Sequence, residues 1–258
     1  MARKKIIFVI VEGPSDEEAL GVILNRIYDS NAVYVHIMHK DITTEFVDAP
    51  NKNIITMIGD EIRGYANANH FKKTDFKAII HLVDTDGAFI PDEGVIEDAS
   101  AVKPYYTTEN IRTCNKASIE SRNKRKRENI NRLCDRRKIW DVPYSVFYMS
   151  CNLDHVLYNK LNISNDEKEH YAYKFAKTYK DKIPQFLDFI KNSAFSVVTG
   201  YNESWDFIKT GLHSLERYTN IGICFDEKDS SVDSFTGILK GNYNDKQVKA
   251  ERIENKEK

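Results

Sequence analysis

The stretch IIFVIVEGPSDEEAL, residues 6–20, decides the fold. Its first six residues are apolar and mostly β-branched, which is typical of a strand buried on both faces of a parallel sheet. Gly13 and Pro14 break this run, and Ser15 with Glu18 three residues later forms the capping-box pattern that begins a helix. Apolar residues then recur at helical spacing. The stretch therefore predicts a strand, a tight turn and a helix, the first half of a βα unit.

The same alternation continues along the chain. Strands are expected at 33–38, 77–83 and 142–150, and helices at 52–68, 117–138 and 153–161. Residues 88–115 show no clear period, so we expect a long loop with short elements there. This alternation predicts an α/β fold with a mostly parallel, Rossmann-like sheet flanked by helices and a helical C-terminal extension.

The chain is expected to divide into three parts. Residues 1–161 carry the alternation and are expected to form a catalytic domain, and residues 162–239 a helical extension packed on it. Helices are expected in the extension at 166–180, 184–192 and 202–217, with a late strand or buried stretch at 221–225. Residues 240–258 are charged and poor in apolar residues, which predicts a disordered tail.

The composition excludes several classes of protein. The 258 residues hold 38 Lys and Arg against 39 Asp and Glu, and 41% are apolar, which argues against both a polybasic coat protein and an acidic disordered chain. The four cysteines are widely spaced, which argues against structural zinc. The apolar run at 6–11 is too short for a signal peptide, and no segment approaches about 20 apolar residues. We therefore expect a soluble, cytoplasmic protein without a membrane partner.

Acidic residues follow two of the predicted buried strands. Glu12 ends the first strand, and Asp84 and Asp86 end the strand at 77–83. Ligands of open parallel sheets bind outside the carboxyl ends of the strands, so these carboxylates are expected to converge, with Asp16 near the same edge. Crowded carboxylates repel unless a cation compensates, and Mg²⁺ or Mn²⁺ is the usual partner. The alternative is that these acids are turn and capping residues, and the helix macrodipole alone would suit Asp16.

Charge is distributed unevenly downstream of these acids. Residues 84–100 hold six acids and no Lys or Arg, whereas residues 116–138 hold ten bases against three acids. A basic helix next to a metal site suits a polyanion whose phosphate reaches the metal. The candidate nucleic-acid-binding residues are Arg122, Lys124, Arg125, Lys126, Arg127, Arg132, Arg136 and Arg137. The alternative is a solvated helix face, which accounts for most charge runs.

Two motifs are similar to those of a known family. FVIVEGPSDEEAL (8–20) followed by IIHLVDTDG (79–87) resembles the Toprim domain, the metal-dependent catalytic domain of topoisomerases, primase-type enzymes and nucleases of the OLD and RloB-like groups. The family pattern is a strand ending in Glu-Gly and a later strand ending in Asp-x-Asp, which 12–13 and 84–86 match in order and context. The resemblance covers about residues 5–160.

The resemblance implies roles for individual residues. Glu12 and Asp84 would hold Mg²⁺ or Mn²⁺, and Asp86 would bind the same ion or a second one. Glu12 acting as a general base is the alternative to its role as a ligand. Asp16 belongs to the form VEG-x-S/T-D, which looks most like the OLD and RloB-like nucleases. These four acids are the expected catalytic and metal-binding residues.

A third motif of these nucleases matches only in part. They often carry Asn-Pro-x-x-Glu between a strand and an aromatic-rich helix, and the corresponding stretch here is MSCNLDHVLYN (149–159). Asp154 takes the position of the Glu, but Ser150 and Cys151 replace Asn-Pro. Asp154 is therefore a candidate site residue, with the first turn of a helix as the alternative explanation.

The resemblance also implies an activity and partners. The expected function is metal-dependent hydrolysis of phosphodiester bonds in DNA or RNA, tRNA included, in antiphage defence. The ATPase signature GxxxxGK[ST] is absent from the chain, and stand-alone Toprim proteins act beside a separate ATPase, so an ABC/OLD-type ATPase subunit is an expected partner. The oligomeric state is open, a homodimer included.

Two other functions compete with this prediction. A haloacid-dehalogenase-type phosphatase would use Asp84 as nucleophile and Asp86 as acid and base, although Ala88 stands where that family usually has Thr and Glu12 is then unexplained. A non-catalytic module would keep the acids for stability or for docking a partner. Glu12→Gln separates the docking module from the nuclease, because a docking module keeps its function after this change.

Overall fold

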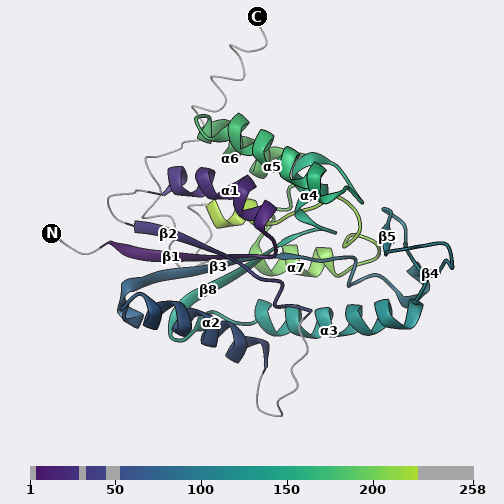
Figure 1. The fold of residues 1–258 in the computed structure, drawn as a ribbon, viewed down its shortest axis with the longest axis horizontal. Helices are drawn as coiled ribbons and strands as arrows, with labels where there is room; N and C mark the ends of the chain where they lie inside the picture. Colours follow the sequence, from purple (N-terminus) through teal and green to yellow (C-terminus); the bar gives the residue numbers. More distant parts are fainter. Residues whose placement is uncertain (1–3, 29–32, 45–52, 226–258) are drawn as a thin grey trace, which may run out of the picture.

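The computed structural model describes residues 4–28, 33–44 and 53–225. It is an α/β structure in which helices flank a mostly parallel sheet, as the alternation of elements predicts (Figure 1). The expected tail at 240–258 lies outside the described residues, and so does 226–239, the last part of the expected helical extension.

The described residues include a central sheet with the strand order β2-β1-β3-β8-β7. The strands are β1 (Lys5–Val11), β2 (Val33–His39), β3 (Phe76–Asp84), β7 (Lys138–Ile139) and β8 (Val142–Met149). The pairings β2-β1, β1-β3 and β3-β8 are parallel, and the short β7 is antiparallel to β8. The carboxyl ends of β1, β3 and β8 therefore lie at one edge of the sheet, where the sequence places its acids.

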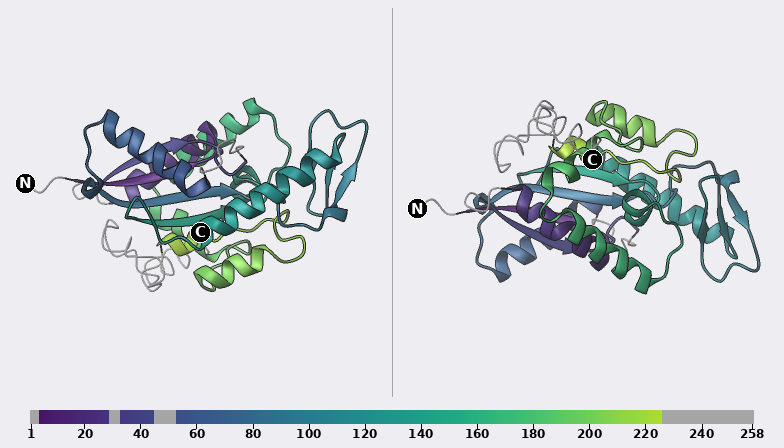
Figure 2. Two further views of the ribbon diagram at one scale, coloured as in Figure 1. Left: turned by 90° about the horizontal axis from the view of Figure 1, so that it is seen from below. Right: turned by 90° about the horizontal axis from the view of Figure 1, so that it is seen from above.

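Helices cover both faces of the sheet (Figure 1; Figure 2). One face carries α1 (Pro14–Ile27), α5 (Asn165–Tyr179) and α6 (Ile183–Asn192), and the other carries α2 (Ile54–Ala68) and α3 (Lys116–Cys134). The central strands are apolar almost throughout because they are covered on both sides. Side chains of the strands and of α5 and α6 belong to one hydrophobic cluster.

The last elements pack along β8. They are α4 (Leu153–Tyr158), α7 (Tyr201–Ile208) and the 3₁₀ helix η3 (Ile221–Phe225). The ring of Trp205 lies 5.1 Å from that of Tyr148, and the ring of Tyr201 lies 5.9 Å from that of Phe147. All residues of the stretch at 221–225 are buried, as expected, but they form a 3₁₀ helix and not a strand.

Two local predictions were wrong. The first helix begins at Pro14 with Gly13 as its N-cap, and it is Asp16, not Glu18, whose side chain accepts the N–H of Gly13, at 2.9 Å. Pro suits the first helical position because its missing N–H would have no partner there. The helix expected at 202–217 ends at Ile208, and the residues after it form turns.

The region from 88 to 115, expected to be a long loop with short elements, contains three short strands that form a small second sheet. Its strands are β4 (Val95–Glu97), β5 (Tyr105–Tyr106) and β6 (Ile111–Thr113), in the order β4-β6-β5. Val95 and Ile111 pack with Ile119 of α3 and with Leu215 in a separate hydrophobic cluster. The small sheet is thereby attached to the amino-terminal part of α3, as Figure 1 shows at the right of the molecule.

All four cysteines lie in the described part of the chain, and all are free thiols. No helix among the described residues is long and apolar enough to cross a bilayer.

Candidate functional site

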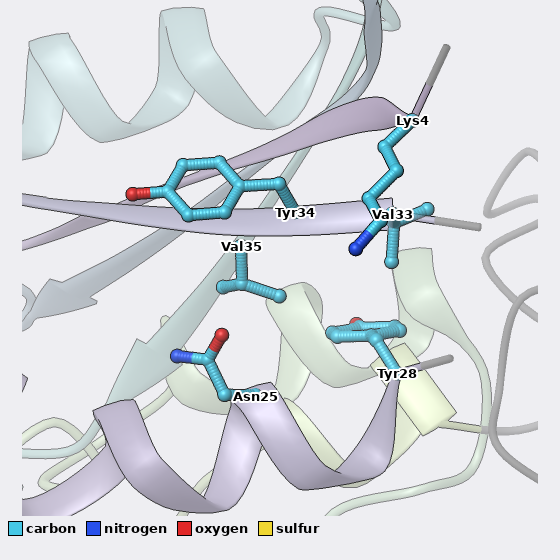
Figure 3. A pocket seen from close by; sticks show the side chains of 6 residues that line it. All are labelled: Lys4, Asn25, Tyr28, Val33, Tyr34 and Val35. Atoms are coloured by element: carbon cyan, nitrogen blue, oxygen red, sulfur yellow. The ribbon is translucent and has the colours of Figure 1, made fainter. Parts of the chain in front are cut away.

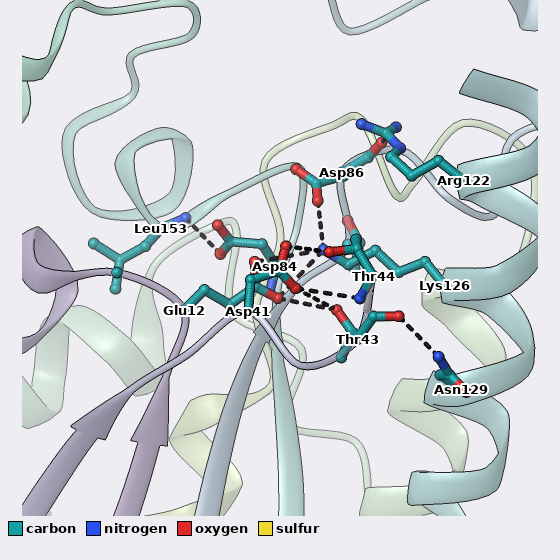
Figure 4. A network of polar contacts seen from close by, with 12 residues as sticks. Glu12, Asp41, Thr43, Thr44, Asp84, Asp86, Arg122, Lys126, Asn129 and Leu153 are labelled. Carbon is teal, nitrogen blue, oxygen red and sulfur yellow. Dashed lines mark hydrogen bonds and ion pairs between the residues drawn. The ribbon is translucent and has the colours of Figure 1, made fainter. Parts of the chain in front are cut away.

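The structure brings the acids of two strand ends into contact. Glu12 directly follows β1, and Asp84 is the last residue of β3. The backbone N–H of Asp84 donates to Glu12 Oε1 at 3.0 Å, although 72 residues separate the two in sequence. Asp84 Oδ1 in turn accepts the backbone N–H of Leu153, the first residue of α4, at 3.0 Å (Figure 4). The two acids are thus positioned by the sheet itself.

Asp86 is held by the turn that follows β3. Its φ of +48° lies in the left-handed region, and its backbone N–H donates to the carbonyl of Cys151 at 2.7 Å. Gly87 follows with φ of +65°, and a Cβ there would lie 2.5 Å from Leu215 Cδ2. Thr85 Oγ1 donates to the carbonyl of Ser214 at 2.7 Å. This turn needs glycine at 87, and it turns the carboxylate of Asp86 toward α3.

Lys126 of α3 joins the acids of the two strand ends. Its side chain is 0% exposed, and its ammonium lies 3.2 Å from Glu12 Oε1 and 3.4 Å from Oε2. The same ammonium donates to Asp86 Oδ2. Lys126 thus bridges two carboxylates that come from different strands (Figure 4). We call Glu12, Asp84, Asp86 and Lys126 the acid cluster.

A loop after β2 closes one side of the acid cluster. Thr43 Oγ1 lies 3.0 Å from Asp41 Oδ1 and 3.4 Å from Glu12 Oε1, and Thr44 Oγ1 donates to Asp41 Oδ2 at 2.6 Å. Helix α3 holds this loop from the other side, since Asn129 Nδ2 donates to the carbonyl of Thr43 at 2.9 Å.

Arg122 and Arg125 of α3 also contact the loops around the acid cluster. The guanidinium of Arg122 donates to the carbonyl of Asp86 at 2.8 Å and to the hydroxyl of Tyr106. Arg125 donates to the carbonyl of Thr44 at 3.0 Å. Both side chains are only half-buried, so their outer parts still face solvent.

A second acidic pair borders the acid cluster. Asp16 of α1 is 8% exposed and Asp154 of α4 is 4% exposed. Lys168 of α5 lies 3.1 Å from Asp154 Oδ2, while Asp154 Oδ1 is buried without a hydrogen-bond partner among the described residues. Asp154, which takes the position of the Glu in the partly matching Asn-Pro-x-x-Glu motif, therefore lies at the same edge of the sheet as the other acids.

Burial dominates the pKa values of these acids. It raises the pKa of Glu12 to about 8, against the lowering effect of Lys126, and it raises the pKa of Asp16 to about 6. The pKa of Asp84 lies well above its usual range because the carboxyl is buried and Glu12 is close. Burial acts on Asp86 in the same direction, but Lys126 and Arg122 outweigh it, so the pKa of Asp86 lies below its usual range. The acid cluster is thus short of positive charge at Glu12 and Asp84.

The donor chemistry fits a hard divalent cation, but the arrangement does not yet form its coordination shell. Carboxylate oxygens are the ligands that Mg²⁺ and Mn²⁺ prefer, and raised pKa values mark carboxylates that lack a counter-charge. Within the described ranges, however, no three His, Cys, Asp or Glu side chains are arranged so as to hold a metal ion. The side chains that would hold it are Glu12, Asp84 and Asp86, and the ammonium of Lys126 lies between two of them.

The structure divides the predicted nucleic-acid-binding residues into three groups. Lys124 and Arg132 on α3 and Arg136 and Arg137 just beyond it are exposed. Arg122, Arg125 and Arg127 are partly buried and have partners within the chain, such as Asp92, 3.5 Å from Arg127. The prediction that Lys126 binds nucleic acid on an exposed basic face was wrong, because its side chain is fully buried in the acid cluster.

In the sequence Lys126 is one base in a run of bases, and its place among the acids was not predicted. The signal was present: Ile119, Asn123, Lys126, Ile130 and Leu133 follow one another at spacings of four and three, and all are buried. The polar loop with Asp41 and Thr43 offered no comparable pattern, because its contacts are long-range in sequence.

The described residues also form a pocket at the opposite end of the sheet. It has a volume of 110 Å³ and lies at the start of β2, between Tyr28, Val33 and Asn25 (Figure 3). Its lining contains no acidic residue, in contrast to the carboxyl edge of the sheet.

Comparison with known proteins found no matching family model, no similar curated protein and no similar solved structure.

Proposed function

We propose that this protein is a Toprim-type, metal-dependent nuclease that hydrolyses phosphodiester bonds of DNA or RNA. The observation that carries the proposal is the contact between Glu12 and Asp84, two largely buried carboxylates at the ends of parallel strands, each with a raised pKa. Strongly perturbed carboxylates at the carboxyl edge of a parallel sheet are candidates for chemistry. The Toprim-like order of Glu-Gly and Asp-x-Asp adds support from the sequence.

The residues of the acid cluster would have distinct tasks. Glu12 and Asp84 would hold Mg²⁺ or Mn²⁺, with Asp86 as a further oxygen ligand. The bound ion would supply activation of water and neutralisation of charge on the phosphate. Arg122 and Arg125, whose outer parts face solvent beside the acids, would orient the nucleic-acid backbone together with the exposed bases of α3.

The phosphatase alternative is less well supported by the same contacts. It would use Asp84 as nucleophile and Asp86 as acid and base, and it gives no task to Glu12, which contacts Asp84 directly. A nuclease uses both acids together.

The resemblance to OLD and RloB-like nucleases extends the proposal to a setting. We propose antiphage defence, with a separate ABC/OLD-type ATPase as partner and tRNA among the substrates. Cleavage that requires the ATPase and ATP would distinguish this setting from a nuclease that acts alone.

The test is cleavage of DNA and total RNA with Mg²⁺, with Mn²⁺ and with EDTA. Wild-type protein is compared with Glu12→Gln, Asp84→Asn and the control Glu169→Gln, an exposed acid on α5. The two site variants are expected to lose about 100- to 1,000-fold in rate, and the control none. Metal-dependent cleavage that survives in both site variants contradicts the proposal, and so does the absence of cleavage in wild-type protein supplied with its ATPase.

A further inference from the structure

The acid cluster consists of three carboxylates and the ammonium of Lys126, whose side chain is completely buried. Three carboxylates and one ammonium leave a formal charge of −2 when all are ionised, which a single divalent ion would balance. A buried ammonium is stable only when paired and hydrogen-bonded. Lys126 meets this condition by contacting both oxygens of Glu12 and one of Asp86.

The helix fixes the ammonium at this place. Ile119 and Ile130 on the same face of α3 are buried in hydrophobic clusters on either side of Lys126. Arg122 and Arg125, which directly precede the buried Asn123 and Lys126, donate to the carbonyls of Asp86 and Thr44. The backbone of Lys126 is thus anchored against both loops of the site, and its ammonium reaches the carboxylates between them.

The ammonium lies where a cation shared by Glu12 and Asp86 would lie. It contacts oxygens of both carboxylates, which come from the ends of different strands. Without a cation between them, these carboxylates would repel each other at close range. The same two carboxylates are ligands in the proposed nuclease, so Lys126 and the divalent ion need the same oxygens.

We propose that Lys126 is a positioning residue that acts as an internal cation: its ammonium holds Glu12 and Asp86 together in the metal-free protein, and a divalent ion bound by this pair displaces it. The proposal rests on the proposed function, because it takes Glu12 and Asp86 as metal ligands. It explains why the described residues contain no preformed three-acid metal site although the oxygen donors are close together.

The test is metal affinity without nucleic acid. Mn²⁺ binding is measured by titration calorimetry for wild-type protein, Lys126→Met and the control Lys174→Met, an exposed lysine on α5. Removing a competing positive charge next to the ligands is expected to tighten Mn²⁺ binding about tenfold or more. The control is expected to bind Mn²⁺ as wild-type protein does. Equal or weaker binding by Lys126→Met overturns the proposal.

Thermal melting gives a second readout. Lys126→Met is expected to melt below wild-type protein in EDTA and to recover most of the difference in Mn²⁺, because the ion replaces the lost ammonium. Lys126→Arg keeps the charge and is expected to show neither the tighter binding nor the larger metal response. If Lys126→Met does not fold in EDTA, refolding on addition of Mn²⁺ supports the proposal, and failure to refold contradicts it.

These outcomes are separable from those of the nuclease test. Tighter Mn²⁺ binding by Lys126→Met without any cleavage by wild-type protein supplied with its ATPase supports the internal cation and contradicts the nuclease. Metal-dependent cleavage together with unchanged Mn²⁺ binding supports the nuclease and contradicts the internal cation.

Discussion

Two lysines meet buried carboxylates at the carboxyl edge of the sheet, and their surroundings differ. Lys126 is 0% exposed and contacts Glu12 and Asp86, whereas the side chain of Lys168 is 37% exposed and contacts Asp154. If the Lys168 ammonium is removed, water can reach Asp154 and replace much of the stabilisation that the ion pair provides. Nothing from solvent reaches Lys126, so its charge and those of its partners depend on one another.

The two groups also differ in their balance of charge. A buried ion pair is a poor source of stability, because removing charges from water costs as much as their attraction returns. The acid cluster nevertheless keeps three carboxylates around one lysine, and it holds the pKa of Glu12 at about 8. A protein selected only for stability would replace these residues by apolar ones. The Asp154–Lys168 pair carries no such excess of charge.

The largest expected effect is the loss of Lys126. In EDTA at pH 7, Lys126→Met should lower the free energy of unfolding by about 3–5 kcal/mol, because the ionised and largely buried Asp86 is left without its partner and Glu12 loses its contact with the same ammonium. Urea denaturation followed by circular dichroism measures the difference. A loss below about 1 kcal/mol would mean that water reaches these carboxylates, and the contrast with Lys168 would disappear.

A smaller effect is expected from Glu12 and depends on pH. Because the folded-state pKa of Glu12 is raised from 4.5 to about 8, its contribution to stability is complete below pH 4.5 and is lost as the pH rises through 8. Glu12→Gln cannot ionise, so without metal its stability relative to wild-type protein should increase between pH 5 and pH 9, by an amount on the order of 1–3 kcal/mol.

The measurement for Glu12 is a series of urea denaturations from pH 5 to pH 9 in EDTA. Glu18→Gln, an exposed acid on α1, is the matched control and should follow wild-type protein at every pH. Parallel curves for Glu12→Gln and wild-type protein would show that Glu12 is ionised throughout and that burial does not raise its pKa.

The sequence predicted the position of the acids because that position follows from the sheet. The apolar runs before Glu12 and Asp84 mark buried parallel strands, and the carboxyl ends of such strands share an edge. The convergence of acids at this edge was therefore predictable from residue types and strand order alone. The small sheet at 95–113 was not predicted, because strands of two or three residues are too short to show a period.

The remaining parts of the site depend on contacts between distant segments. Lys126 stands in a run of bases that looks solvent-exposed, and its burial shows only when the apolar residues on the same helix face are aligned with it. The helix expected at 202–217 ends at Ile208 because the later residues serve the turn after β3: the carbonyl of Ser214 accepts hydrogen bonds from Gly87, Thr85 and Cys151. Helix propensity along the sequence does not show that the carbonyl of Ser214 accepts hydrogen bonds from distant segments.

The smallest expected effect completes the comparison. Lys168→Met should cost about 1 kcal/mol or less at pH 7, because solvent screens the exposed ammonium and Asp154 can take up a proton, its pKa being raised by burial. The cost should shrink further in 1 M salt, where the Debye length is about 3 Å, whereas the cost of Lys126→Met should hardly change. Urea denaturation at low and high salt measures both. A cost for Lys168→Met that matches that of Lys126→Met and resists salt would place Lys168 in the same buried network, and the carboxyl edge would then hold one charge cluster with two internal cations.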